Sequence, residues 1–215
     1  MTEPIAGVVF DVDGTLADTL PLIYDALNRV LEASGRATMA DAEIRAMFGP
    51  SEEGIIAQLM GEEWEDPFEA FLAYYEERHP DYVRPFPGVH ELLRWLGDQG
   101  ARRGVVTGKG ARTAEVTLRL LELERYFEVV EAGSPDGSRK PEALRRVVGR
   151  WGLPPARVAY VGDSANDMAA ARSVGAVGLG AAWAGEATAD VLRDAGASAV
   201  FPTPEDLHQW LEKAF

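Results

Sequence analysis

The segment that decides the fold is Ile5–Leu16, which reads IAGVVFDVDGTL. Its first half is a short apolar run without alternation, and such a run predicts a strand buried on both faces of a sheet. Asp11 and Asp13 follow the run directly, with Gly14 and Thr15 after them. Open α/β sheets bind ligands beyond the carboxyl ends of their strands. The segment therefore predicts a central strand and a candidate site at its end.

Similar apolar runs recur along the rest of the chain. They lie at residues 104–107, 127–130, 158–161 and 176–179, with a weaker run at 199–201. Between these runs, apolar residues recur at helical spacing, as at Val89, Leu92, Leu93 and Leu96. Strands that alternate with helices of this length predict an α/β fold: a Rossmann-like parallel sheet covered by helices on both faces.

The alternation stops between about Leu16 and Tyr82, where only helical patterns are found. The helices predicted there cover residues 20–33, 40–47, 52–60 and 67–78, separated by Gly35, Gly49-Pro50 and Gly61. A helical stretch of this length is too long for one crossover between neighbouring strands. We therefore predict an all-helical subdomain, residues 16–82, inserted into an α/β core made of residues 1–15 and 83–215.

The composition limits the classes of partner. The 215 residues include 21 Lys and Arg against 35 Asp and Glu, a formal net charge of −14 at pH 7. This average charge repels nucleic acid and anionic membranes, so neither is an expected partner. The chain has no cysteine, which excludes disulfides, thiolate metal sites and a Cys nucleophile. It also shows no export signal and no apolar run near the roughly 18 residues of a membrane span, so we expect a soluble cytoplasmic protein.

Polar residues follow four of the predicted strands, at the edge where ligands are expected. They are Asp11 and Asp13 after the first strand, Thr107, Gly108 and Lys109 after the second, Arg139-Lys140-Pro141 after the third, and Gly162-Asp163-Ser164 with Asn166-Asp167 after the fourth. Carboxylates brought together repel one another, and a hard divalent cation relieves that repulsion. Mg²⁺ takes oxygen ligands and also accepts phosphate oxygens. A Lys and a Thr hydroxyl beside a short Gly loop suit the remaining phosphoryl oxygens.

These residue types can carry out phosphoryl transfer. A carboxylate can attack phosphorus and form an aspartyl-phosphate, and a second carboxylate two residues on can protonate the leaving oxygen and later deprotonate water. Two other phosphate-binding patterns are excluded. Gly104 and Gly108 have three residues between them, whereas a P-loop has four, and Thr113 stands where a dinucleotide-binding fingerprint has its last Gly.

Four motifs in this order resemble those of the haloacid-dehalogenase (HAD) superfamily. They are residues 10–16 (FDVDGTL), Thr107, Lys140-Pro141 and residues 162–167 (GDSAND). The resemblance covers essentially the whole chain, and the helical insertion stands where the superfamily places its C1-type cap. Asp-Gly-Thr-Leu followed by Asp18-Thr19 is most similar to the phosphoglycolate-phosphatase-like members.

The resemblance implies catalytic and substrate-binding roles for five residues. Asp11 would be the nucleophile and Asp13 the general acid and base. Thr107, the Gly108 amide and Lys140 would hold the transferring phosphoryl group and offset its charge. Phosphoglycolate members often have Asn where Gly108 stands, so this position departs from their pattern.

The resemblance also implies a Mg²⁺ site. Asp11, the backbone carbonyl of Asp13 and Asp163 would be the ligands, and Asp167 would belong to the metal shell, either directly or through water. The implied function is a Mg²⁺-dependent phosphomonoester hydrolase that acts on a small phosphorylated metabolite, 2-phosphoglycolate first of all, through an aspartyl-phosphate.

Two alternative functions are a phosphosugar mutase of the β-phosphoglucomutase type and a catalytically silent regulator that binds phosphate or metal. A mutase cap should carry polar sugar-binding groups, and residues 16–82 contain no Lys, which weighs against the mutase. Every catalytic position holds a competent residue, which weighs against the silent regulator. A monomer and a homodimer are both compatible with the sequence.

Several further residues receive an interpretation from sequence alone. The carboxylate of 2-phosphoglycolate needs a cationic or amide contact, and Arg29, Arg36 and Arg45 are the cap arginines before Arg78. The break Gly49-Pro50-Ser51 is predicted to form a loop that faces the active site. We expect Trp64, Tyr74 and Tyr75 to pack in the cap, Glu62-Glu63 and Glu76-Glu77 to be solvated, and His79, His90 and His208 to lie at the surface.

Overall fold

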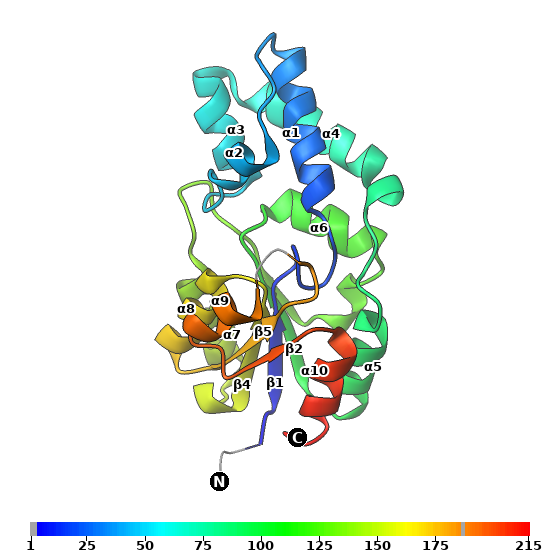
Figure 1. Ribbon diagram of the computed structural model, residues 1–215, viewed down its shortest axis with the longest axis vertical. Helices are drawn as coiled ribbons and strands as arrows, with labels where there is room; N and C mark the ends of the chain where they lie inside the picture. Colours follow the sequence, from blue (N-terminus) through cyan, green and yellow to red (C-terminus); the bar gives the residue numbers. More distant parts are fainter. Residues whose placement is uncertain (1–3, 186–187) are drawn as a thin grey trace.

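The computed structural model describes residues 4–185 and 188–215, and its centre is a six-stranded sheet (Figure 1). All neighbouring strands are parallel, in the order β3-β2-β1-β4-β5-β6. The strands are β1 (Gly7–Phe10), β2 (Arg102–Val106), β3 (Val129–Glu131), β4 (Val158–Gly162), β5 (Val177–Ala181) and β6 (Ala199–Phe201). The helices of this part are α5 (Val89–Asp98), α6 (Ala111–Leu120), α7 (Lys140–Trp151), α8 (Ala165–Val174), α9 (Ala189–Asp194) and α10 (Pro204–Leu211).

Strand β1 is buried on both faces because its side chains alternate between two hydrophobic clusters. Val8 and Phe10 belong to a cluster that includes side chains of α5, α6 and α10. Val9 belongs to a second cluster, formed with side chains of α7 and α8. All three are at most 2% exposed. The prediction of a Rossmann-like parallel sheet covered on both faces is therefore confirmed.

The helical segment lies between β1 and β2, beyond the end of the sheet that is far from both chain termini (Figure 1). It contains α1 (Leu20–Ala33), α2 (Asp41–Arg45), α3 (Glu52–Met60) and α4 (Glu65–Tyr82). Helices α1 and α3 have the predicted bounds, and α1 packs along α4. Helix α4 also packs on α6, where the Tyr75 hydroxyl lies 2.9 Å from the Thr117 hydroxyl. Residues 1–3 of the predicted core lie outside the described residues.

Several element boundaries differ from the predictions. Helix α2 covers only Asp41–Arg45 where residues 40–47 were expected, and α4 starts at Glu65 instead of residue 67. Helix α4 continues to Tyr82 and contains Pro80, whereas the predicted helix ended at Arg78. Strand β3 starts two residues later than predicted, because Phe127 ends a short 3-10 helix and Glu131 pairs with Val106. The prediction relied on the apolar run that begins at Phe127, and it therefore placed the start of this edge strand too early in the chain. The short 3-10 helices are Gly61–Glu63, Glu124–Tyr126 and Pro155–Arg157.

The prediction that His79 lies at the surface is wrong. Its side chain is 1% exposed and its ring packs edge-on to Tyr75 at 5.6 Å. Burial, with Lys109 as the next cause, lowers the pKa of His79 to about 4, so the imidazole is neutral near pH 7. His90 and His208 are partly exposed. Tyr75 packs in the interior, as predicted.

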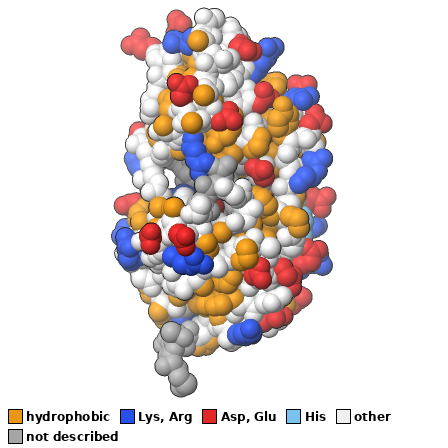
Figure 2. All heavy atoms as spheres, in the orientation of Figure 1, with side chains coloured by type: hydrophobic (Ala, Val, Ile, Leu, Met, Phe, Trp, Pro, Cys, Tyr) orange, Lys and Arg blue, Asp and Glu red, His pale blue; other side chains and the backbone are white. Residues whose placement is uncertain are grey.

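Acidic and basic side chains are interspersed on the face that Figure 2 shows, over the helical segment and the sheet region alike. Glu62-Glu63 and Glu76-Glu77 are exposed, as predicted. Among the described helices, none combines the length and the apolarity that crossing a bilayer requires.

Candidate active site

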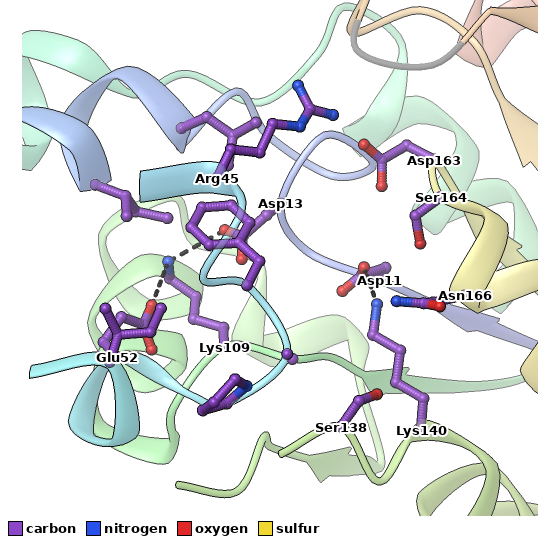
Figure 3. Close-up of a pocket in the computed structure, with 17 residues that line it drawn as sticks. Asp11, Asp13, Arg45, Glu52, Lys109, Ser138, Lys140, Asp163, Ser164 and Asn166 are labelled. Atoms are coloured by element: carbon purple, nitrogen blue, oxygen red, sulfur yellow. Dashed lines mark hydrogen bonds and ion pairs between the residues drawn. The ribbon is translucent and has the colours of Figure 1, made fainter. Parts of the chain in front are cut away.

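A cavity of about 320 Å³ lies between the carboxyl ends of the central strands and the helical segment (Figure 3). The sheet region contributes Asp11, Asp13, Gly108, Lys140 and Asp163 to its lining, among other residues. The helical segment contributes Leu20, Ile23, Arg45, Phe48, Gly49, Pro50, Glu52 and Ile55. The cavity thus has a charged floor and a largely apolar roof that also contains Arg45 and Glu52.

The floor is organised around the ammonium group of Lys140, the first residue of α7. Lys140 Nζ donates to Asp11 Oδ2 at 2.6 Å and to Asp167 Oδ1 at 2.7 Å. The side chains of all three are at most 10% exposed. Burial alone would lower the pKa of Lys140, but the two carboxylates raise it above its ordinary value, so the group is an ammonium. Ion pairs thereby hold together Asp11, Lys140 and Asp167, which belong to three motifs far apart in the sequence.

Asp167 is held in place by its own surroundings. Tyr160 donates to Asp167 Oδ1 at 2.8 Å, and the Ser164 amide and hydroxyl donate to Asp167 Oδ2 at 3.0 and 2.5 Å. Ser164 and Asp167 form the capping box of α8. A Cβ at Gly162 would stand 2.4 Å from the Asp167 carboxyl carbon, so this position needs glycine. Both oxygens of Asp167 are engaged by protein donors.

Asp11, Asp163 and Asp167 form a cluster of carboxylates that can hold a metal ion. One oxygen of each lies within 4.8 Å of the others. Burial raises the pKa of Asp11 to about 6, and burial with the charges of Asp167 and Asp11 raises that of Asp163 well above its ordinary value. No hydrogen bond or ion pair among the described residues uses Asp163. An all-oxygen set that includes a half-buried carboxylate without a protein partner fits a hard divalent cation.

Gly14 brings the first and fourth motifs together. Its φ is +71°, and a Cβ there would stand 2.2 Å from Asp163 Oδ2. The backbone conformation and the close approach both exclude a larger residue. The sequence Asp13-Gly14 therefore lets the loop after β1 pass directly against Asp163.

Asp13 lies at the cavity with one oxygen engaged. Asp13 Oδ1 accepts a short hydrogen bond from the Thr19 hydroxyl and a second bond, 3.1 Å long, from Lys109 Nζ. Its side chain is 21% exposed. The second carboxylate oxygen has no protein donor among the described residues, so it is the one that can exchange a proton with a ligand.

Thr107 and Gly108 lie at the end of β2, at different depths. The Thr107 side chain is buried, and its Oγ1 accepts from the Lys109 amide at 3.1 Å. Thr107 does not line the cavity, whereas Gly108 does, and a Cβ at Gly108 would stand 3.8 Å from Lys140 Cε. Gly133 packs directly against this turn. A Cβ at Gly133 would stand 1.9 Å from the Gly108 carbonyl oxygen, so the contact requires glycine.

Sequence reasoning missed roles for Lys109 and Glu52. The sequence places Lys109 among the polar residues after the second strand without assigning it a role, and Glu52 only at the start of a predicted helix. In the structure Lys109 Nζ lies 3.1 Å from both Asp13 Oδ1 and Glu52 Oε1 (Figure 3). The single signal was the position of Lys109 beside Thr107 and Gly108, because Glu52 lies 57 positions away in the chain.

The structure separates the three arginines singled out in the helical segment, Arg29, Arg36 and Arg45. Arg45 lines the cavity, whereas Arg29 is 62% exposed beside Glu32 and Arg36 is exposed and does not line the cavity. Gly49 and Pro50 line the cavity, so the loop that contains them faces the site, as predicted.

A sequence profile of the haloacid dehalogenase-like hydrolases matches residues 8–180. The chain belongs to this family. A phosphoglycolate phosphatase of Nitrosococcus oceani is 32% identical over 177 residues, 77% of this chain and 79% of that protein. A phosphorylated carbohydrates phosphatase of Thermotoga maritima is 32% identical over 174 residues, 78% of this chain and 81% of that protein.

Solved structures agree with this assignment to the family. A hydrolase from Pseudomonas syringae superposes with a TM-score of 0.78 at 27% identity, covering 98% of this chain and 99% of that one. CbbY from Rhodobacter sphaeroides, solved with phosphate, gives a TM-score of 0.79 at 22% identity, with coverage of 94% and 96%, and so shares the fold. The resemblance stated from the sequence motifs is confirmed.

Removing Asp167 tests the charge network on the floor of the cavity. We predict that Asp167→Ala lowers the free energy of unfolding by about 3–5 kcal/mol, because it leaves the buried Lys140 ammonium with one partner fewer. Urea unfolding followed by circular dichroism measures this. The matched control is Asp190→Ala, which removes a carboxylate 88% exposed from a 2.8 Å pair with Arg193 and should cost under about 1 kcal/mol. Equal losses in the two variants would contradict the interpretation.

Proposed function

We propose that this protein is a Mg²⁺-dependent phosphomonoester hydrolase that acts on a small phosphorylated metabolite, with 2-phosphoglycolate as the first candidate. The observation that carries the proposal is the pair of Asp11 with a buried Lys140 ammonium at the floor of the cavity. A nucleophilic carboxylate beside a fixed cation suits the transfer of an anionic phosphoryl group. The phosphatase names of the relatives support the same chemistry.

The proposal divides the chain into two parts with different tasks. Residues 1–15 and 83–215 would carry the chemistry, and residues 16–82 would be a cap that selects the substrate. The position of α1 to α4 over the carboxyl ends of the strands supports this division. A roof over the cavity would also exclude bulk water and large substrates such as phosphoproteins.

The residues that would hold Mg²⁺ are Asp11, Asp163 and the main-chain carbonyl of Asp13. Asp167, whose oxygens are already bonded to Lys140, Tyr160 and Ser164, would support the site indirectly. When bound, Mg²⁺ neutralises the clustered carboxylates and the phosphoryl oxygens, so that Asp11 stays ionised.

The chain's own residues would carry out two displacements at phosphorus. In the first, an Asp11 oxygen forms a bond to phosphorus while the ester P–O bond breaks and Asp13 gives its proton to the leaving oxygen. In the second, Asp13 takes a proton from water, the water oxygen bonds to phosphorus and the bond to Asp11 breaks. Lys140 and the Gly108 amide would hold the phosphoryl group through both steps. Thr107, whose hydroxyl accepts from the Lys109 amide, would fix the turn that contains Gly108.

Phosphate release from a panel of small phosphate esters tests this function. We predict turnover with Mg²⁺ that falls to background with EDTA, and a preference for 2-phosphoglycolate within the panel. Asp11→Asn should abolish turnover, because an amide of the same shape cannot attack phosphorus. Clean Asp11→Asn protein that retains turnover would exclude Asp11 as the nucleophile. Wild-type protein that binds Mg²⁺ and hydrolyses no ester would contradict the proposal as a whole.

Arg45 supplies a prediction about the substrate. It is the cap arginine that lines the cavity, so it is placed to contact the carboxylate of 2-phosphoglycolate. Arg45→Gln should raise KM for 2-phosphoglycolate about tenfold, the loss expected for one charge-assisted hydrogen bond. KM for an ester without a second anionic group should change little.

The matched control for this prediction is Arg36→Gln, which removes an exposed cap arginine away from the cavity. It should leave KM for both esters at the wild-type value. An equal rise of KM for the two esters in Arg45→Gln would exclude a specific contact with the substrate carboxylate.

A further inference from the structure

We propose that Glu52, on the helical segment, is a positioning residue for Asp13 that acts through Lys109. The inference rests on the proposed function, since it concerns the proton transfer assigned to Asp13. It means that the acid and base of the reaction is aligned only when α3 of the cap is seated on the sheet region.

Both oxygens of Glu52 are engaged by donors of the segment that follows β2. Oε1 accepts from Lys109 Nζ at 3.1 Å, and Oε2 accepts from the Gly110 amide at 2.6 Å and from the Thr113 hydroxyl at 2.9 Å. Glu52 is 4% exposed. Its carboxylate thus caps the start of α6 from another part of the chain, and no oxygen is left over for a substrate.

Lys109 is completely enclosed by this arrangement. Its side chain has no exposed surface, and its ammonium lies 4.8 Å from the centre of the Tyr75 ring. The remaining partner is Asp13 Oδ1 at 3.1 Å (Figure 3). Lys109 therefore joins a cap carboxylate to the Asp13 carboxylate across the cavity wall.

Stability alone is a poor explanation for these buried charges. Taking two charges out of water costs about as much as their attraction returns, and apolar residues of the same volume are often as stable. Lys109 is nevertheless placed on the one carboxylate that must exchange a proton with the ligand. The contact of the Lys109–Glu52 ion pair with Asp13, rather than its contribution to stability, therefore indicates what the pair does.

The arrangement fixes which oxygen of Asp13 carries the proton. With Lys109 and Thr19 both donating to Oδ1, the proton of Asp13 resides on the other oxygen, the one without a protein donor. Proton transfer is sensitive to such placement, because a shift of about 1 Å can cost 100-fold in rate. Without Glu52, Lys109 loses a partner and can turn away from Asp13.

Because Glu52 lies on α3, the alignment of Asp13 depends on how α3 packs against the sheet region. The Ser51 amide donates to the Ser134 carbonyl at 2.9 Å, and a Cβ at Gly54 would stand 2.3 Å from the Pro135 carbonyl oxygen. The first turn of α3 is therefore in close contact with the loop after β3, in addition to its contact with the segment that follows β2. Glu52 reaches Lys109 only from this seated position.

The first test is a comparison of Glu52→Gln with Glu53→Gln in steady-state kinetics, on the ester that the wild type hydrolyses fastest. Glu52→Gln keeps the shape of the side chain but removes its charge. It should lower kcat about 10- to 100-fold and leave KM within about threefold, since Glu52 does not contact the substrate. Glu53, the next residue on α3, has no hydrogen bond to Lys109, so Glu53→Gln should match the wild type.

The second test reads the position of Lys109 without using activity. The sequence contains only three lysines, Lys109, Lys140 and Lys213. Acetic anhydride labelling of the full chain, followed by mass spectrometry of peptides, gives a rate for each. Lys213 is exposed and Lys140 is buried, so they are internal standards. Glu52→Gln should label Lys109 about tenfold faster, because losing a carboxylate partner lowers the pKa of its ammonium, with Lys140 and Lys213 unchanged.

The outcomes separate this inference from the proposed function. Slow labelling of Lys109 in Glu52→Gln, or a normal kcat despite fast labelling, would contradict the positioning role while the wild type remains a phosphatase. A large rise in KM with unchanged kcat would make Glu52 a substrate contact and also overturn the inference. Wild-type protein that hydrolyses no ester would contradict the proposed function, and with it the role of Glu52, whatever the labelling shows.

Discussion

The structure depends on one constraint: several charges are buried together at the carboxyl edge of the sheet. Lys140 is held between Asp11 and Asp167, and Asp167 is held in turn by Tyr160 and Ser164. Each charge is tolerable only because the next one is in place. Asp163, which has no partner among the described residues, marks the place where a cation completes the set.

The same constraint accounts for the glycines around the site. Gly14 allows its loop to pass against Asp163, and Gly162 leaves room for the Asp167 carboxyl group. Glycine at these positions lets the loops after β1 and β4 approach closely enough for their carboxylates to meet. A second buried ion pair, Lys109 with Glu52, connects the helical segment to this edge of the sheet. Charged contacts therefore link the roof of the cavity to its floor.

Much of this could be predicted from the sequence because the relevant signals are local. The unbroken apolar run before Asp11 indicated a strand buried on both faces, and polar residues after parallel strands must meet at one edge. The pair of Glu52 with Lys109 could not be predicted, because it joins segments 57 positions apart and Glu52 belongs to no motif. The burial of His79 was missed for a similar reason, since it depends on how α4 packs over α6.

The measurement that tests the central claim most directly is the detection of a phosphoryl group on Asp11. Asp13→Asn protein, which lacks the base for the second displacement, would be mixed with Mg²⁺ and p-nitrophenyl phosphate, an ester whose leaving group needs no proton. After an acid quench, mass spectrometry of the peptide that contains Asp11 should show one HPO₃ adduct, absent when Asp11 is also changed to Asn. A peptide that stays unmodified while p-nitrophenol is released would contradict nucleophilic attack by Asp11.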